Sequence, residues 1–516
     1  MISTDIKKES LVFYDSPLSP CARRVRVTLA AKRIPHQVQY VDISRAEQKT
    51  AAYKAINPFG KVPALMHNGR PLWESNIITQ YLDEAFPGAP LYPTDAGDYA
   101  RVREWQAFEI RFAQSFFMLM YHRTVGVFMR VSKANIEQFI AGIRLQSDDP
   151  AFIEFNKKAY LGTLLSEQEE AGHVQVLENG IQTMEDCLSD GRPYLIGARF
   201  SQADISVFPR IRMLTFLGIE VSATGYPRTR QWLDRVAAHP SMHASMTANE
   251  QMMSNPLMLR MIRWARFRSL QPASKLSLSE RLRLKIMRKL FSLDAMKLER
   301  AVSRIRKTLP RRRHTVPVAE AAAPASPPSR LVLHYNPATE EGQTARDLLH
   351  WLGADCSGQI SNAALPSLTL DEVSVQGLPT IVDVLHRALP QAARGFPADA
   401  YARARARIWV GGDKEGETKY LKPALDTEHC PPEILEAARG FIRQQIKQVD
   451  AALADGDWLD QAFGFADIVT ARRLQTYCAD FGSHDLEDYP RVQKWITAVE
   501  LQLGDKESIT PAMQEA

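Results

Sequence analysis

Residues 57–83 constrain the fold of this chain more than any other stretch; they read N-P-F-G-K-V-P-A-L-M-H-N-G-R-P-L-W-E-S-N-I-I-T-Q-Y-L-D. A short apolar run at 62–65 and a second candidate strand at 70–73 flank the Asn-Gly pair at 68–69, which is typical of a tight β-hairpin. Pro63 removes a ladder donor from the first run, so it fits an edge or a special backbone position, including a cis peptide bond. The stretch therefore predicts a hairpin with an unusual backbone at its start.

A helix is expected directly after this hairpin. Glu74 and Ser75 stand at its start, and apolar side chains follow at helical spacing at 77, 78, 81 and 82. The first N–H groups of a helix have no partner within it, so a serine placed there can bind a carboxylate. The Glu-Ser pair is therefore a candidate anion anchor.

The chain before this stretch predicts two more strands and two helices. Ser19 stands at or beside the N-cap of the first helix, and Pro20 suits its first turn, where a missing N–H costs nothing. The expected elements are strands at 11–14 and 38–41, a loop and helix within 16–29, and a short helix at 46–55. Their order is β-α-β-α-β-β-α.

This order resembles the N-terminal, thioredoxin-like domain of the soluble glutathione transferases, and the V-P and E-S pairs occur at that family's spacing. The resemblance implies that Val62, before a cis Pro63, offers its backbone to the cysteinyl part of glutathione. It also implies that Glu74 and Ser75 hold the γ-glutamyl end. The alternative is a hairpin and capped helix in some other thioredoxin-like protein.

Such a site has to stabilise a thiolate. A free thiol has a pKa of about 8.5, and a helix N-terminus with one well-aimed hydroxyl donor lowers it. In the serine-type classes of the family, zeta and theta, the donor lies six residues before the valine of the helix motif. Counting back from Val25 gives Ser19, whereas the omega class carries a cysteine at this place.

Three neighbouring residues keep other interpretations open. Ser16 lies in the same loop, and Cys21 lies two residues into the motif, where the zeta class also has a cysteine. Ser19 itself could be a plain helix cap. Lys49 lies 13 residues before Val62, the position from which a lysine of omega-class relatives reaches the glycyl carboxylate; the alternative is a solvated helix lysine.

From about residue 93 to 240 the strand patterns stop and long helical patterns follow. Residues 99–120 are rich in aromatic side chains, and in the family this helix lines the hydrophobic substrate pocket. Ser201 and Asp204 form an S-x-x-D capping box at the start of a later buried helix. This pair is expected to stabilise the fold and not to take part in catalysis.

The chain contains an internal repeat. F-S-Q-A-D-I-S at 200–206 matches F-G-F-A-D-I-V at 463–469, and Y-P-R-T-R-Q-W at 226–232 matches Y-P-R-V-Q-K-W at 489–495. Both pairs share an offset of 263 residues. The second half therefore resembles another transferase unit.

The candidate site of this second copy has decayed. Thr339 falls where Ser19 stood, but Glu340 and Glu341 follow it, and two carboxylates would oppose a neighbouring thiolate. Leu378-Pro379 is a candidate for the strand proline, whereas the Asn-Gly hairpin and the Glu-Ser pair have no counterpart. We expect no glutathione binding there and a structural role, with the two units pairing within one chain in place of the family's usual dimer.

The basic charge of the chain is concentrated in one segment. The whole chain carries +5, yet residues 257–313 hold 18 Lys or Arg against three acidic side chains. Leu282, Ile286, Leu290 and Leu293 recur there at helical spacing. A basic amphipathic helix can lie on an anionic membrane surface or bind an acidic partner, or simply pack its apolar side on the protein. No nucleic-acid reader fold is recognisable, and 316–328 reads as an Ala/Pro linker.

The remaining composition limits the setting. No apolar run reaches the length of a membrane span, and no secretory signal is visible at the N-terminus. The five cysteines are scattered without metal-ligand spacing. We therefore expect no metal, and a reducing, cytoplasmic setting in which glutathione is plentiful.

The sequence as a whole predicts a thioredoxin-like α/β domain followed by an all-α domain, repeated twice and joined by a basic helical connector. Glutathione would be the co-substrate, activated in the first copy for attack on a hydrophobic electrophile by conjugation, isomerisation, dehalogenation or ether cleavage. The alternative is a non-enzymatic scaffold that recruits a partner or membrane through the basic helix. The expected domains are 9–88 (glutathione-binding), 93–245 (helical), 246–328 (connector and linker), 329–391 (degenerate thioredoxin-like) and 396–505 (second helical).

Overall fold

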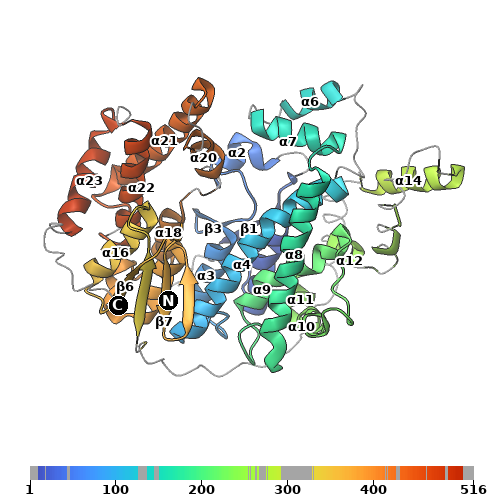
Figure 1. Cartoon of the computed structure of the whole chain (residues 1–516), viewed down its shortest axis with the longest axis horizontal. Coiled ribbons are helices and arrows are strands. Elements are labelled where there is room, and N and C mark those ends of the chain that lie inside the picture. The colour runs from blue at the N-terminus through green and yellow to red at the C-terminus, as the bar shows by residue number, and fades with distance from the viewer. Residues whose placement is uncertain are drawn as a thin grey trace, which may run out of the picture. The chain divides into compact units, whose positions relative to one another are not determined.

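The computed structural model divides into two compact units, whose helices and strands are labelled in Figure 1. Unit 1 comprises Met1–Leu91 and Trp105–Glu320, and unit 2 comprises Tyr92–Glu104 and Ala321–Ala516. The structure describes residues 10–503, apart from 18, 44–46, 126–135, 145–149, 254, 256, 258, 262–263, 266–274, 276, 292–327, 329, 413, 415–416, 426–429, 461 and 483–485.

Unit 1 opens with a four-stranded sheet of order β2-β1-β3-β4. Strand β1 runs parallel to β2 and antiparallel to β3, with Phe13 opposite both Val38 and Leu65. The chain order of strands and helices is the predicted β-α-β-α-β-β-α. The strands are β1 Leu11–Asp15, β2 Gln37–Tyr40, β3 Ala64–His67 and β4 Arg70–Trp73; the helices are α1 Pro20–Ala31, the 3₁₀ turn Glu47–Lys49 with α2 Ala51–Lys54, and α3 Ser75–Ala85.

Local sequence chemistry explains these elements. Asn68 and Gly69 both have positive φ, 52° and 79°, which is the backbone that a two-residue hairpin needs and that these residue types tolerate. Phe13, Leu65 and Leu72 are fully buried. They stand opposite one another on neighbouring strands, so their side chains lie on the same face of the sheet. The hairpin therefore delivers the chain to the start of α3 in a fixed register.

The remainder of unit 1 is helical. The buried helix α9 begins at the expected capping box, in which Ser201 N–H donates to Asp204 over 3.0 Å, and Trp232 Nε1 donates to the same carboxylate over 2.8 Å. The helices are α4 Ala96–Met120, the π-helical turn Tyr121–Val125, α6 Ile136–Arg144, α7 Pro150–Leu161, α8 Glu167–Cys187 with the 3₁₀ turn Leu188–Asp190, α9 Gln202–Leu217, α10 Pro227–Ala238, α11 Pro240–Ala244, α12 Ala248–Met253 and α14 Leu278–Phe291.

Unit 2 contains a second sheet of the same topology, in the order β6-β5-β7-β8. Its helix α22 begins with the same contact as α9, because Trp495 Nε1 donates to Asp467 over 2.9 Å. Its elements are β5 Leu331–Tyr335, α16 Glu340–Leu352, β6 Ser357–Ile360, β7 Ser367–Leu370, β8 Val373–Gln376, α17 Leu378–Ala388, the 3₁₀ turn Pro390–Gly395, α18 Ala400–Gly411, the π-helical turn Glu417–Leu421, α20 Lys422–Leu425, α21 Pro432–Ala452, the 3₁₀ turn Leu453–Asp455, α22 Phe465–Phe481 and α23 Pro490–Leu503.

One expectation for the second sheet is wrong. Leu378 and Pro379 are not the strand proline; they form the first turn of α17, where a missing N–H is tolerated. Pro366, directly before β7, stands where Pro63 stands before β3. A hairpin is also present between β7 and β8, with Asp371 at φ 51° in place of Asn68.

Unit 2 also includes the first turns of α4. Arg103 pairs with Asp383 of α17 at 2.9 Å, and Arg407 of α18 pairs with the same carboxylate at 2.7 Å. The Arg387 guanidinium lies 4.8 Å from the ring centre of Tyr99. The segment Tyr92–Glu104 is thus held to α17 by buried charge and by cation–π contact.

The connector is only partly described. Helix α14 begins at a capping box, in which Ser277 N–H donates to Glu280 over 2.9 Å. The arginine run at 311–313 and the Ala/Pro segment at 316–328 lie, but for residue 328, outside the described residues. Among the described helices, none is both long enough and apolar enough to cross a membrane.

Candidate active site

Ser19 caps helix α1. Its Oγ accepts a hydrogen bond from Ala22 N–H over 3.2 Å, and its own N–H donates to the Ser16 carbonyl over 3.0 Å. A hydroxyl can accept and donate at once, so capping leaves its proton for a ligand. Ser19 is 9% exposed and Ser16 only 3%, which favours Ser19 as the residue that reaches a bound molecule.

Cys21 lies in the first turn of α1. Its thiol is partly exposed, and Arg210 Nη2 lies 3.7 Å from its Sγ. The structure therefore places the Cys21 thiol beside the guanidinium of Arg210. Cys21 stays an alternative to Ser19.

The segment before β3 brings two further candidate residues near the same sheet. The Val62–Pro63 peptide bond is cis. Lys49 Nζ approaches the Phe59 carbonyl at 3.5 Å, and its side chain also lies against Gly60. Lys49 is thus folded against the turn that leads into Val62.

Glu74 and Ser75 form the start of α3. Glu74 is the N-cap residue with φ 65° and ψ 110°, a conformation that non-glycine residues rarely adopt. Ser75 is 8% exposed, and its Oγ accepts a hydrogen bond from Arg24 Nη1 over 3.0 Å. An uncommon backbone of this kind, directly before the candidate anchor Ser75, is a feature often found at functional sites.

A buried cluster of ion pairs holds Arg24, the residue that donates to Ser75, and the sequence did not predict this cluster. Arg24 pairs with Glu109 of α4 at 2.5 Å, and Arg210 of α9 pairs with the second oxygen of that carboxylate. Burial raises the pKa of Glu109, but the two guanidinium groups outweigh it and hold the pKa below its ordinary value. Glu109 thus fixes the guanidinium that donates to Ser75.

One sequence feature could have indicated this cluster of ion pairs, namely the three closely spaced arginines of α1. Arg23, Arg24 and Arg26 are all buried, and a buried arginine requires a partner. The sequence does not say which acids supply the partners.

Comparison with known proteins places these features in a family. Two family models match, "Glutathione S-transferase, N-terminal domain" over residues 18–85 and "Glutathione S-transferase, C-terminal domain" over 167–235. Protein LigF of Sphingobium sp. is 30% identical over 227 residues, which cover 42% of this chain and 84% of LigF. The chain belongs to the glutathione transferase family.

Other relatives match this transferase over shorter stretches. Glutathione S-transferase Z1 of Arabidopsis thaliana is 32% identical over 26% of this chain and 59% of its own length. A probable maleylacetoacetate isomerase 2 of Drosophila melanogaster is 38% identical over 20% of this chain and 44% of its own length. The solved structure of the beta-etherase LigF from Sphingobium sp. strain SYK-6 covers 46% of this chain and 98% of that chain, with 26% identity and a TM-score of 0.42.

The second unit of this transferase has a different site. Thr339 caps α16 by accepting from Gly342 N–H over 3.2 Å, much as Ser19 caps α1. Gly377 at φ 84° stands where Glu74 stands, and Leu378 stands where Ser75 stands. The Leu378 N–H donates to Glu341 over 3.2 Å, so a carboxylate of the chain itself lies at the start of α17.

The charges around Glu341 reinforce this difference. Lys414 Nζ lies 2.9 Å from Glu341 and 2.9 Å from Glu417. Burial raises the pKa of Glu340. Within the described residues of the whole transferase, no cluster of three or more His, Cys, Asp or Glu side chains is placed to hold a metal ion.

Proposed function

We propose that unit 1 activates glutathione as a thiolate and transfers it to an electrophilic carbon. The observation that carries the proposal is Ser75 at the start of α3, with its hydroxyl held by Arg24, whose guanidinium is in turn fixed by Glu109 and Arg210. Glu74, Ser75 and the Val62 backbone would bind the γ-glutamyl and cysteinyl parts. Lys49 would face the glycyl carboxylate.

Ser19 would act on the sulfur. The N-terminus of α1 carries a partial positive charge, and the Ser19 O–H can donate toward an anion while its Oγ still caps the helix. Both effects lower the pKa of a thiol bound there. A carbon–sulfur bond then forms, the bond to the leaving group breaks, and the leaving group departs with the electron pair and takes up a proton.

Among electrophiles, we propose a β-ether as the first to test. The support is LigF, which matches this transferase over 84% of its length and whose solved structure is described as a beta-etherase. In ether cleavage the thiolate forms the carbon–sulfur bond and the carbon–oxygen bond breaks, so that an alkoxide or phenoxide leaves. Conjugation, isomerisation and dehalogenation begin from the same thiolate.

Calorimetric titration of glutathione into the intact chain tests this proposal. We expect one site per chain and at least tenfold weaker binding to Ser75→Ala, because a hydrogen bond to a charged group contributes about 1.5–3 kcal/mol. Ser166→Ala is the matched control: Ser166 is another helix-capping serine of unit 1, exposed, and should leave affinity unchanged. Absence of binding by the parent chain, or equal binding by Ser75→Ala, would refute the site.

For unit 2 we infer a structural role, in which it supplies the surface that a second subunit would supply. The support is that Tyr92–Glu104 belongs by its contacts to unit 2, where Arg103 shares Asp383 with Arg407. Sedimentation of the intact protein tests this. We expect a monomer at micromolar concentration. Asp383→Ala removes the carboxylate that Arg103 and Arg407 share, and it should broaden the distribution of sedimentation coefficients.

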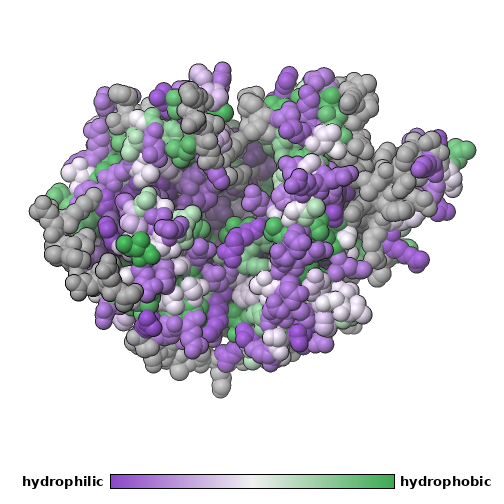
Figure 2. Space-filling view, viewed as in Figure 1, coloured by the Kyte–Doolittle hydropathy of each residue, from purple (hydrophilic) through white to green (hydrophobic). Residues whose placement is uncertain are grey.

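A second candidate function rests on α14. Leu278 and Leu282 are 85% and 59% exposed, and the neighbouring Arg281 and Arg283 are exposed as well. Figure 2 shows hydrophobic atoms beside hydrophilic ones at the end of this helix. Such a surface suits an anionic membrane. Cosedimentation with phosphatidylserine vesicles, lost in Arg281→Glu/Arg283→Glu and absent with phosphatidylcholine, would support recruitment; no cosedimentation would exclude it.

A further inference from the structure

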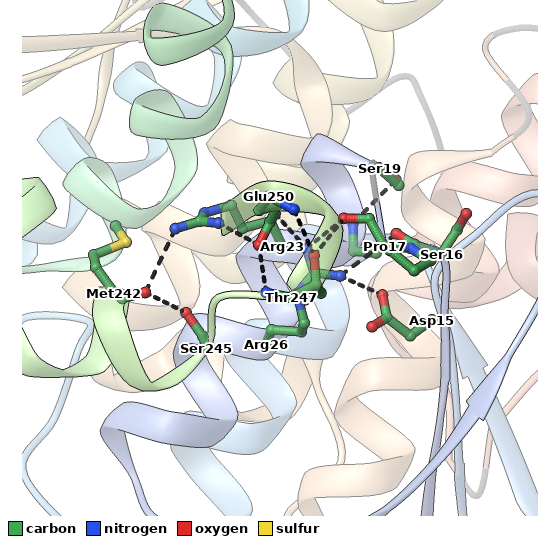
Figure 3. Close-up of polar contacts among 11 residues, drawn as sticks. Asp15, Ser16, Pro17, Ser19, Arg23, Arg26, Met242, Ser245, Thr247 and Glu250 are labelled. Carbon is green, nitrogen blue, oxygen red and sulfur yellow. Dashed lines mark hydrogen bonds and ion pairs between the residues drawn. The ribbon is translucent and has the colours of Figure 1, made fainter. Parts of the chain in front are cut away.

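The two remaining arginines of α1 hold the turn that precedes the helix. Arg26 Nη1 lies 2.5 Å from Asp15 and 3.4 Å from the Ser16 carbonyl. Its Nη2 donates to the Pro17 carbonyl over 3.1 Å and to Glu250 over 2.6 Å. One buried guanidinium therefore contacts the end of β1, two successive carbonyls of the turn, and a residue of α12 (Figure 3).

Glu250 completes the arrangement from a distant part of the sequence. Its second oxygen pairs with Arg23 at 2.5 Å and accepts from Thr247 N–H over 2.9 Å. Thr247 Oγ1 also donates to the Pro17 carbonyl over 3.5 Å. Glu250 therefore contacts both Arg23 and Arg26, and Arg26 and Thr247 both contact the Pro17 carbonyl of the turn (Figure 3).

Glu250 is ionised at neutral pH. Burial raises the pKa of Glu250, but Arg26 and Arg23 outweigh that effect and the net pKa lies below the ordinary value. Asp15 and Glu250 balance the two guanidinium groups. Neutralising Glu250 would leave a buried positive charge that is shared by Arg23 and Arg26, and the contacts of Arg26 to the turn would no longer be fixed from the α12 side.

We propose that Glu250 is a positioning residue for the thiolate site, acting through Arg26 on the turn that carries Ser19. The link is short: Arg26 donates to the Ser16 carbonyl, and the same carbonyl accepts the Ser19 N–H over 3.0 Å. The direction of the Ser19 hydroxyl therefore depends on a carboxylate of α12. This inference rests on the proposed role of Ser19 in thiolate activation.

The γ-glutamyl anchor does not depend on Glu250. Ser75 is held by Arg24, whose acid is Glu109 and not Glu250. Loss of Glu250 should therefore change the ionisation of bound glutathione and leave its affinity nearly unchanged. A residue that merely stabilises the fold would affect both properties or neither.

The test is the pKa of the thiol of enzyme-bound glutathione, followed by the ultraviolet absorbance of the thiolate in the intact chain and in Glu250→Gln. We expect this pKa to rise by about one unit in Glu250→Gln, so that the thiolate fraction falls about tenfold below the pKa. A purely electrostatic effect has the opposite sign, because removing a carboxylate would lower the thiol pKa. An unchanged or lowered pKa therefore overturns the proposal.

Controls separate this inference from the proposed function and from misfolding. Asp234→Asn, which removes the carboxylate of a surface ion pair in the same unit, should leave the thiol pKa unchanged. Glutathione affinity within about threefold of the parent shows that Glu250→Gln is folded. If Glu250→Gln does not fold, Arg26→Lys replaces it. That variant keeps the positive charge but loses the planar guanidinium that spans the turn, so it should also raise the thiol pKa. If the intact chain itself shows no lowered thiol pKa, the proposed function fails, and not only this inference.

Discussion

The two units begin the corresponding helix with different residues. In each, a four-stranded sheet of one topology delivers the chain to a helix whose first N–H groups need an acceptor. In unit 1 that helix begins with Ser75, supported by Arg24, whereas in unit 2 it begins with Leu378, whose N–H binds the chain's own Glu341. The difference teaches that the residue at the helix start and the charge beside it, and not the fold alone, are the features to associate with a ligand.

The comparison extends to the late helix of each unit. Arg210 and Arg473 stand 263 residues apart, at matching places in α9 and α22. Arg210 pairs with Glu109 and thereby supports Arg24. Arg473 instead lies 3.4 Å from Glu417 and donates to the carbonyls of α18. An arginine stands at this place in both units, but among the described contacts it shares a carboxylate with the arginine of a candidate anchor only in unit 1.

The largest effect is expected from Glu109→Gln. It leaves Arg24 and Arg210 buried without their shared carboxylate, and breaking a buried pair in this way costs about 3–5 kcal/mol in unfolding free energy. Urea unfolding followed by tryptophan fluorescence measures it. Asp98→Asn, at an exposed pair on the same helix, should change stability by no more than about 0.5 kcal/mol. A loss below 1 kcal/mol in Glu109→Gln would show that this cluster of ion pairs does not organise unit 1.

The next effect compares the two helix caps. Ser19→Ala and Thr339→Ala each remove an N-cap hydrogen bond and should each cost about 1 kcal/mol of stability. Only Ser19→Ala should lower glutathione-dependent turnover, by about 100-fold, since it also removes a donor to the thiolate. Melting curves and steady-state rates of the pair measure this. Equal rates in both variants would show that Ser19 only caps the helix and would leave Cys21 as the candidate for catalysis.

A smaller effect is expected from Glu341→Ala. The variant frees the Leu378 N–H and loses the pair with Lys414, which is substantially exposed, so the cost should be about 1 kcal/mol. Glutathione should still bind at one site per chain, because Gly377 and Leu378 supply no polar side chain. A second site in calorimetry would contradict this and show that Glu341 alone keeps the ligand out of unit 2.

The features that the sequence predicted correctly are those fixed by neighbouring residues. The Asn-Gly hairpin, the Ser19 cap and the Ser201–Asp204 box depend on side chains within four positions of the backbone groups they satisfy. Family resemblance added roles for Val62, Glu74 and Ser75, which remain predictions. Leu378-Pro379 was placed wrongly because a proline fits both a strand start and a first helical turn.

The features that the sequence did not show are contacts between distant residues. Arg24 and Glu109 are 85 positions apart, and Arg26 and Glu250 are 224 apart. Helical periodicity counts arginine as an exposed residue, so it assigns the three arginines of α1 to the surface although they are buried. The charge partners of these arginines become visible only once the helices are packed.

The smallest effect concerns pH and unit 2. Burial raises the pKa of Asp467 to about 6 and that of Asp460 to about 7, from an ordinary value near 3.8. Between about pH 4 and pH 7 the folded unit therefore binds more protons than the unfolded chain, and its stability falls as the pH rises through this window.

Asp460→Asn removes the larger shift, since an amide does not ionise. We expect the variant to match the parent at pH 4 and to melt about 2–4 °C higher at pH 8, for a gain of about 1 kcal/mol. Differential scanning calorimetry at both pH values measures this, and an equal difference at pH 4 and pH 8 would show that packing, and not the buried charge of Asp460, sets the stability of unit 2.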